Sequence, residues 1–242
     1  MSKTTNQDEN KPRPEKELNS SRRSFLQYSG AAIATSAILL SGCEMLEDYI
    51  PPKNPKPGDP APNTVNLGSG DIGILNYAYA LEQLEAAFYT KVALTGFFRG
   101  ANYEDVRVLN DVLQHEIAHR DFFKAALGSN AIPDLRFDFS MVDFGDKSSV
   151  LSTAQTFEDL GVAAYNGAGS LIKNKDFLLV AGKIVSVEAR HAEAIQDLIN
   201  PGGAFVDFID DGLDRAFTPT MVLQAASPFI VTKINASNLP KS

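Results

Sequence analysis

The stretch Glu116-Ile117-Ala118-His119 is followed later in the chain by a second of the same kind, Glu188-Ala189-Arg190-His191. Two of the three histidines in the sequence therefore lie three residues after a glutamate, each among helix-forming residues. On an α-helix, positions i and i+3 lie on one face, so each motif presents a carboxylate and an imidazole side by side. The pattern predicts two facing helices that together supply half of a site for two metal ions.

Four segments carry apolar residues at helical spacing, with good helix formers between them. They are residues 72–95, 103–127, 149–173 and 176–199. Short links join the first segment to the second and the third to the fourth, whereas residues 128–148 separate the two pairs. A link of that length is too long for a tight hairpin. The sequence therefore predicts an all-α fold, a four-helix bundle with one long crossover between helices 2 and 3.

The two halves of this bundle repeat one another. Leu81-Glu82-Gln83-Leu84 is followed by Tyr89, seven residues after the glutamate. Phe157-Glu158-Asp159-Leu160 is followed in the same way by Tyr165. In each half, a helix with a glutamate thus precedes a helix with the Glu-x-x-His motif. The repeat selects Glu82 over Glu85 as the inward-facing glutamate of the first half.

The motifs and their partner glutamates supply four carboxylates and two imidazoles, from Glu82, Glu116, His119, Glu158, Glu188 and His191. In one bundle core this set suits two divalent first-row metal ions, Fe or Mn, and Zn would also bind. Two such ions balance the charge of four carboxylates, which would otherwise repel one another in a poorly solvated core. The alternative is a set of buried salt bridges with Arg107, Arg120 or Arg190.

Glu85 breaks the symmetry of the repeat. It aligns with Gly161 and lies one helical turn from Glu82, on nearly the same face. An extra carboxylate there would favour redox switching or an asymmetric metal pair. Glu85 is therefore either a seventh ligand or a solvated glutamate at the edge of the bundle.

Three further side chains lie close to the ligand motifs. Tyr89 and Tyr165 are two helical turns from their glutamates. They either donate a hydrogen bond to a ligand or pass an electron, or they are core aromatics with a satisfied hydroxyl. His115 directly precedes Glu116, so it points about 100° away around the helix. That direction indicates a surface or interface histidine and not a ligand.

The motifs, their order and the crossover resemble the ferritin-like superfamily, which includes bacterioferritin, rubrerythrin and manganese catalase. Within it, the chain is similar to exported bacterial ferritin-like domain proteins related to a plant desiccation-related protein. The resemblance covers about residues 71–200. It implies that Glu116 and Glu188 bridge two metal ions. The terminal ligands that it implies are Glu82 and His119 on one metal, and Glu158 and His191 on the other.

The beginning of the chain is typical of an export signal. Ser21-Arg22-Arg23-Ser24-Phe25-Leu26 precedes an apolar run at residues 31–40 and resembles a twin-arginine signal. The run is short for a membrane span and ends in Leu40-Ser41-Gly42-Cys43, which resembles a lipoprotein lipobox. We expect residues 1–42 to be removed and Cys43 to be lipidated, so that a periplasmic or other extracytoplasmic protein is anchored to a membrane. A plain transmembrane anchor is the alternative.

Composition divides the remainder of the chain into three parts. Residues 43–66 are rich in proline and predict an extended tether. The bundle is expected over residues 67–200. Residues 201–242 keep too many apolar side chains for a disordered tail, so we expect this extension to pack on the bundle. Within it, residues 204–217 and 219–226 are expected to form short helices.

The negative net charge and the absence of several enzyme motifs exclude some classes of function. The net charge is −8, and an acidic surface repels phosphate backbones, so no nucleic-acid partner is expected. Residues 71–242 hold no Gly-rich phosphate loop, CxxC pair or GxSxG motif. We expect a dimetal protein with oxidoreductase activity of the ferroxidase or catalase kind, acting on Fe²⁺, peroxide or O₂. The alternatives are a stress-protective or binding module without a redox metal, and an iron-storage cage, which a lipid anchor disfavours. A homodimer is left open.

Overall fold

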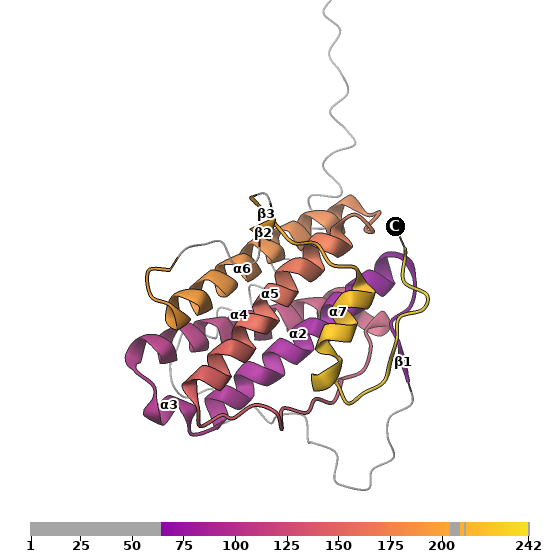
Figure 1. Ribbon diagram of the computed structural model, residues 1–242. Coiled ribbons are helices and arrows are strands. Elements are labelled where there is room, and N and C mark those ends of the chain that lie inside the picture. The colour runs from indigo at the N-terminus through magenta and orange to yellow at the C-terminus, as the bar shows by residue number, and fades with distance from the viewer. Residues whose placement is uncertain (1–63, 204–208, 211, 242) are drawn as a thin grey trace, which may run out of the picture. The chain divides into compact units, whose positions relative to one another are not determined.

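Four long helices form the body of the molecule. The computed structural model describes residues 64–203, 209–210 and 212–241. The long helices within this part are α2 (Gly70–Leu94), α4 (Tyr103–Leu127), α5 (Lys147–Gly169) and α6 (Lys175–Ile199). α2 packs along α4 and α5 along α6, and the two pairs lie against each other in one bundle (Figure 1). The predicted all-α bundle is confirmed.

Polar side chains fix where three of these helices begin. Asn102, Asp146 and Asn174 each accept hydrogen bonds from backbone N–H groups of the first helical turn. Such caps satisfy donors that have no partner within the helix. The helix expected over 149–173 begins two residues earlier because Asp146 caps it. It ends at Gly169, after which the chain turns toward α6.

The crossover from α4 to α5 is held against α2 by two buried amide side chains. It begins with a 3-10 turn, η1 (Gly128–Asn130). Asn76 Nδ2 donates to the carbonyl of Asn130 (2.9 Å), and Asn76 Oδ1 accepts from the N–H of Ile132 (3.0 Å). Gln83 Oε1 accepts from the N–H of Leu135 (2.7 Å). The polar residues of α2 thus satisfy backbone groups that an irregular buried segment would otherwise leave unpaired.

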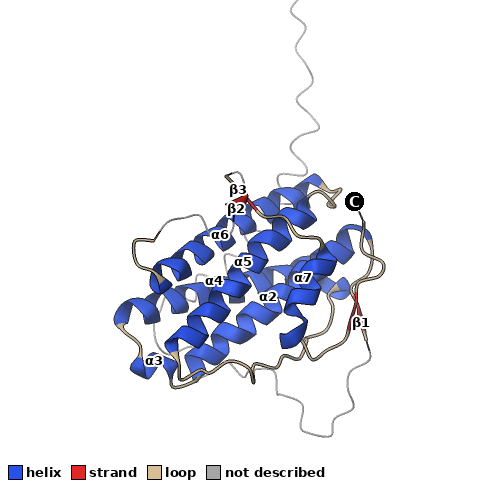
Figure 2. Ribbon diagram, viewed as in Figure 1, coloured by secondary structure: helices blue, strands red, loops and turns tan. Residues whose placement is uncertain are grey.

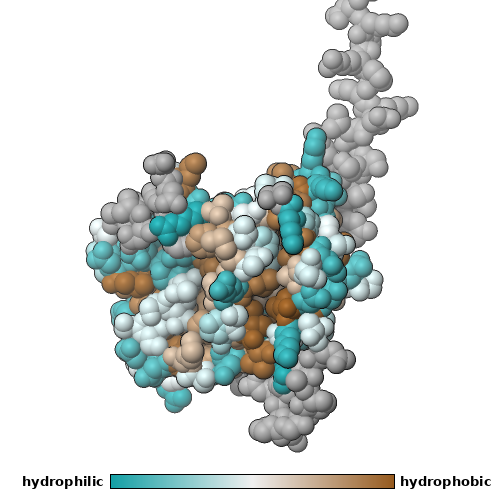
Figure 3. Space-filling view, turned by 45° about the vertical axis from the view of Figure 1, so that its right-hand side comes forward, coloured by the Kyte–Doolittle hydropathy of each residue, from teal (hydrophilic) through white to brown (hydrophobic). Residues whose placement is uncertain are grey.

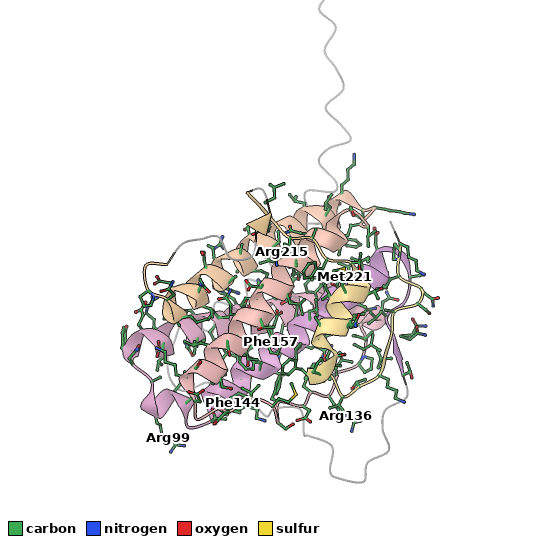
Figure 4. The ribbon with its side chains drawn as sticks, in the orientation of Figure 1. Arg99, Arg136, Phe144, Phe157, Arg215 and Met221 are labelled. Atoms are coloured by element: carbon green, nitrogen blue, oxygen red, sulfur yellow. The ribbon has the colours of Figure 1, made fainter. Side chains whose placement is uncertain are left out.

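Aromatic rings join the bundle, the crossover and the C-terminal segment. Phe157 of α5, labelled in Figure 4, packs edge-on against Phe88 of α2 and against Phe229, with ring centroids 5.1 and 4.8 Å apart. Phe139 of the crossover lies 5.8 Å from Phe88 and 6.3 Å from Phe229. Edge-to-face packing at these distances is favourable beyond the area that it buries. The cluster ties three distant parts of the sequence together.

The C-terminal segment returns along the bundle. α7 (Pro219–Ala226) packs on α5, and η2 (Ser227–Phe229) follows it. Further on, β4 (Ile234–Asn235) pairs in parallel with β1 (Val65–Asn66), so the ends of the described chain lie side by side (Figure 2). α7 buries Val222 and Ala226 fully. On the face shown in Figure 3, apolar surface lies in patches between polar side chains.

The helix expected over residues 204–217 is wrong for the described part of that range. β2 (Ile209–Asp210) and β3 (Leu213–Asp214) instead form a short antiparallel hairpin. The sequence between them is Asp211-Gly212, and an Asp-Gly dipeptide is among the strongest short-range hairpin signals. Four flanking residues pair here, so the local turn outweighs the apolar pattern that suggested a helix.

Two remaining features concern the ends of the helices and the membrane. A short helix, α3 (Phe97–Gly100), lies in the link between α2 and α4. Among the residues that the structure describes, no helix combines the length and the hydropathy needed to cross a bilayer. The expected signal over residues 1–42, the lipidated Cys43 and the tether up to residue 63 lie outside the described residues.

We predict that Gly167→Ala destabilises the protein, because a Cβ there would overlap the carbonyl group of Phe217. The N–H of Phe217 donates to the carbonyl of Ala163 (2.9 Å), so the C-terminal segment crosses α5 at this point. The expected loss in the free energy of unfolding is about 1–3 kcal/mol, typical of overpacking. Urea denaturation measures it.

The matched control is Gly182→Ala on α6, where a Cβ would meet no heavy atom within 4 Å. This substitution should stabilise the protein by up to ~1 kcal/mol, the difference in helix propensity between Gly and Ala. Equal effects of the two substitutions would mean that the C-terminal segment does not press on α5.

Candidate metal centre

The four long helices bring the six predicted ligands together in one buried cluster. α2 contributes Glu82, α4 contributes Glu116 and His119, α5 contributes Glu158, and α6 contributes Glu188 and His191. Five of the six residues are at most 4% exposed, and the side chain of His119 is 14% exposed. Carboxylates are almost never buried so deeply unless a partner compensates their charge.

The first ligand group surrounds the Nδ1 atom of His119. Glu188 Oε1 lies 2.9 Å from this atom, Glu82 Oε2 lies 3.3 Å away and Glu116 Oε2 lies 3.7 Å away. The ligand atoms of this group all lie within 4.8 Å of one another. Three carboxylates and one imidazole therefore converge on a space that a single cation can fill.

The second ligand group surrounds the Nδ1 atom of His191 in the same way. Glu116 Oε1 lies 2.8 Å from it, Glu158 Oε2 lies 3.3 Å away and Glu188 Oε2 lies 3.4 Å away. Glu116 and Glu188 belong to both groups, and each turns one oxygen to His119 and the other to His191. A carboxylate placed in this way can bind two cations at once.

Two tyrosines fix the other two glutamates from across the bundle. The hydroxyl of Tyr89 donates to Glu158 Oε1, and the hydroxyl of Tyr165 donates to Glu82 Oε1. Each tyrosine thus binds the glutamate of the opposite half of the repeat. In both cases the remaining oxygen, Oε2, is the one that faces an imidazole. Burial raises the pKa of both tyrosines well above the usual value, so they remain protonated donors.

The atoms that face one another in the cluster lack hydrogen-bond partners of good geometry. Within the described residues, these buried atoms are Glu82 Oε2, Glu158 Oε2, both oxygens of Glu116 and Glu188, and the Nδ1 atoms of His119 and His191. Buried polar atoms are normally satisfied, and leaving them without partners is costly. Eight such atoms in one place fit a pair of divalent cations, because carboxylate and imidazole are good ligands for first-row metals.

Arginine pairing is the alternative explanation of the cluster. Arg107 forms ion pairs with Glu104 and Asp111 on the exposed face of α4. Arg120 forms its ion pair with the neighbouring Asp121. The ion pairs of the buried glutamates described above are made with the two imidazoles, which are themselves metal ligands by type.

A model of the ferritin-like domain family matches residues 70–201, more than half of the 242-residue chain. The chain belongs to the ferritin-like family. The matched region contains all four long helices and all six clustered residues. No curated protein matches the sequence significantly. The narrower relation to bacterioferritin, rubrerythrin or desiccation-related proteins stays a prediction from the motifs.

In the metal-free ferritin-like domain, protons take over the task of balancing charge. Burial, together with Glu188 and Glu158, raises the pKa of Glu116 to about 8, and burial raises that of Glu158 to about 7. Burial would also raise the pKa of Glu188, but the imidazoles of His119 and His191, which face its two oxygens, lower it to about 2. Burial would lower the pKa of both imidazoles, yet the surrounding carboxylates raise it, to about 12 for His191. The imidazoles therefore act as cations where metals would sit.

Glu85 is buried, so the interpretation as a solvated glutamate at the bundle edge is wrong. Only 4% of its surface is exposed. A Cβ added at Gly161 would lie 3.1 Å from Glu85 Oε1 and 3.9 Å from Glu188 Oε2. The missing side chain at Gly161 thus makes room for Glu85 beside the cluster. Burial, followed by the four clustered glutamates, raises the pKa of Glu85 well above its usual value.

His115 is more closely connected to the cluster than its place on the helix suggested. It is partly exposed, as expected, but its Nδ1 lies 2.8 Å from His191 Nε2, and the two rings lie edge to edge, with centroids 5.1 Å apart and planes inclined by 18°. Burial, followed by the neighbouring imidazoles His191 and His119, lowers the pKa of His115. A partner for His191 could have been expected, because a histidine that binds a metal usually forms a hydrogen bond through its other ring nitrogen.

We predict that the metal-free protein loses stability as the pH rises from about 5 to 8. In this range Glu116 and Glu158 stay protonated in the fold longer than in the unfolded chain, because their folded pKa values exceed the usual 4.5. The unfolded state then binds fewer protons, so the free energy of unfolding falls with pH. The raised pKa values of the two imidazoles act in the same direction at the upper end of the range.

Urea denaturation in a chelator, at several pH values, checks this dependence. Glu116→Gln should flatten the slope, whereas Glu104→Gln, at an exposed position of the same helix, should leave it as in the native sequence. Saturating Mn²⁺ should also reduce the slope, because the metal replaces the protons. A free energy of unfolding that rises steadily from pH 5 to 8 would contradict the protonated cluster.

Proposed function

We propose that this ferritin-like domain binds two divalent metal ions, Fe or Mn, and uses them to oxidise Fe²⁺ or to consume peroxide or O₂. The observation that supports this most directly is the pair of ligand groups that share Glu116 and Glu188. Four carboxylates match the charge of two divalent ions, which removes the repulsion between them. Zn would fit the same ligands but has no redox chemistry.

The side chains divide the work of holding the pair. Glu116 and Glu188 would each bind both ions, because each turns one oxygen to His119 and the other to His191. Glu82 and His119 complete one position, and Glu158 and His191 complete the other. Fe or Mn would supply the electron-transfer chemistry when bound. Tyr89 and Tyr165 hold one oxygen of each terminal glutamate and thereby aim the other at its ion.

The burial of the site favours small substrates. Glu116, Glu158 and Glu188 are fully buried, and His119 is the most exposed of the six residues, with 14% of its side chain accessible. We therefore propose a substrate of only a few atoms, because just one of the six residues, His119, has a side chain exposed by more than a few per cent. Fe²⁺, O₂ and hydrogen peroxide all satisfy this condition, whereas an organic substrate of ordinary size does not.

Glu85 is proposed as a protonated neighbour of the metal pair and not as a seventh ligand. It belongs to neither of the two ligand groups. Its ionisation would also add a fifth buried negative charge to a site that two divalent ions already balance. As a neutral acid it can donate a hydrogen bond toward the carboxylates beside Gly161, and it can give or take a proton during the reaction.

We predict that the protein binds close to two Fe or Mn ions and that Glu116→Ala with Glu188→Ala abolishes this binding. Both bridging positions are then lost, so neither ion keeps more than two ligands. Elemental mass spectrometry with Fe, Mn and Zn quantified together measures the content, and circular dichroism should report a domain that is still helical. Unchanged metal content in the double variant would end the dimetal proposal.

Two controls sharpen this test. Glu104→Gln with Asp111→Asn removes two acidic groups from the exposed face of α4 and should leave the metal content unchanged. Glu85→Gln should keep both ions, because a neutral amide replaces a neutral acid. The Fe- or Mn-loaded protein should then oxidise Fe²⁺ or consume peroxide, and the Zn-loaded protein should not. A native chain that binds no added metal would indicate a stress-protective or binding module instead.

We also propose that the chain is exported and anchored through a lipid on Cys43, with its metal site outside the cytoplasm. The paired Arg22 and Arg23, the apolar run and the sequence before Cys43 support this.

We predict that Cys43→Ala, expressed in a bacterium with twin-arginine export, moves the protein from the membrane fraction to the soluble fraction. Immunoblots of the fractions measure this, with Cys43→Ala compared with a neighbouring Ser41→Ala. Equal membrane association of both variants would favour a transmembrane anchor.

A further inference from the structure

The two ring nitrogens of His191 face different surroundings. Nδ1 points to Glu116, Glu158 and Glu188, at 2.8, 3.3 and 3.4 Å. Nε2 points away from these carboxylates and lies 2.8 Å from Nδ1 of His115. The rings of His115 and His191 are also inclined by only 18° to each other. His115 therefore contacts the one atom of the His191 ring that could fix its tautomer without competing for a metal.

A metal on His191 determines which atom carries the proton. Nδ1 must be free of its proton to bind the metal, so the proton of the neutral ring sits on Nε2. That N–H donates to Nδ1 of His115, which must accept and therefore carries its own proton on Nε2. The bond holds the His191 ring at a fixed orientation and makes Nδ1 a stronger donor to the metal.

The position on α6 that matches His115 holds no hydrogen-bonding side chain. The residue that directly precedes Glu188 on α6 is Val187, whose side chain has no hydrogen-bonding group. The exposure of the two imidazoles differs in the same sense, with 14% of the His119 side chain and 5% of the His191 side chain accessible. The six predicted ligands thus follow the repeat, whereas the residues before the two Glu-x-x-His motifs, His115 and Val187, differ.

We propose that His115 is a positioning residue that makes the metal position of Glu116, Glu158, Glu188 and His191 the tighter of the two. The inference rests on the proposed binding of two metals. His115 touches no metal in this arrangement and acts only through the ring of His191. Partners of this kind typically change metal affinity by about 10- to 100-fold. The two ions then load in order, first beside His191 and second beside His119.

Anaerobic titration of the full chain with Co²⁺ tests this order, since Co²⁺ bound to imidazole and carboxylate is followed by its visible absorption. The native chain should bind two ions in two resolved steps. His115→Leu should weaken the tighter step about 10- to 100-fold and leave the weaker one unchanged. Val187→Ala, at the matching position of α6, should change neither step.

A pair of amide variants separates hydrogen bonding from packing. In His115→Asn the amide oxygen can lie close to the place of Nδ1, so this variant should restore most of the affinity. In His115→Gln the oxygen is one carbon further out, so it should restore little. This comparison keeps the test decisive even if His115→Leu lowers the stability of the fold. Nitrogen-15 NMR of labelled histidines in the Zn²⁺-loaded native chain should show His191 with its proton on Nε2.

The outcomes separate this inference from the proposed function on which it rests. Two ions bound by the native chain with the same affinities in His115→Leu would overturn the positioning role of His115 and leave the dimetal site intact. A proton on Nδ1 of His191 in the Zn²⁺ form would overturn it as well. A native chain that binds no Co²⁺, Zn²⁺ or Mn²⁺ would overturn both proposals together.

Discussion

The repulsion among buried carboxylates is the constraint on which the rest of this structure depends. Glu82, Glu116, Glu158 and Glu188 lie in the core at 1% exposure or less, where like charges are screened poorly. A fold with this core requires compensating positive charge, either from metal ions or from protons on the two imidazoles and on Glu116 and Glu158. The hydrogen bonds from Tyr89 and Tyr165 orient Glu158 and Glu82 toward the imidazoles, and Glu116 and Glu188 belong to both ligand groups. Both features place carboxylate oxygens where such cations would lie.

The topology provides this arrangement with little additional structure. Two helix pairs each carry one glutamate on the first helix and one Glu-x-x-His motif on the second, so packing the pairs together completes two ligand groups. The crossover is the element that makes the repeat possible, and Asn76 and Gln83 bind its backbone on the side of α2. The C-terminal segment adds Phe229 to the aromatic cluster around Phe157, which closes the core from outside the bundle.

Most of the fold could be predicted from the sequence because it follows from periodic patterns. The predicted helix over residues 103–127 has the bounds of α4, where the structure shows Asn102 capping the start and Gly128 following the end. The hairpin at β2 and β3 is not predicted, because the helix is inferred from the apolar residues of 204–217 without regard to the Asp-Gly turn signal within them. The place of Glu85 depends on the space left by Gly161, and the role of His115 depends on how α4 packs against α6. Neither of these contacts between helices can be predicted from the spacing of residues along a single helix.

Both departures from the repeat have the same direction. Glu85 and His115 belong to the first helix pair, and their counterparts in the second pair, Gly161 and Val187, offer no polar group. Each of the two polar residues reaches across to the second half, Glu85 to the space beside Gly161 and His115 to the ring of His191. Of the two, His115 contacts one imidazole of the cluster, whereas Glu85 lies near Glu188, which both ligand groups share. In the proposed dimetal site, the six ligands that follow the repeat would thus form two different metal positions through neighbouring residues that bind no metal, so that one ion could stay bound while the other reacts or exchanges.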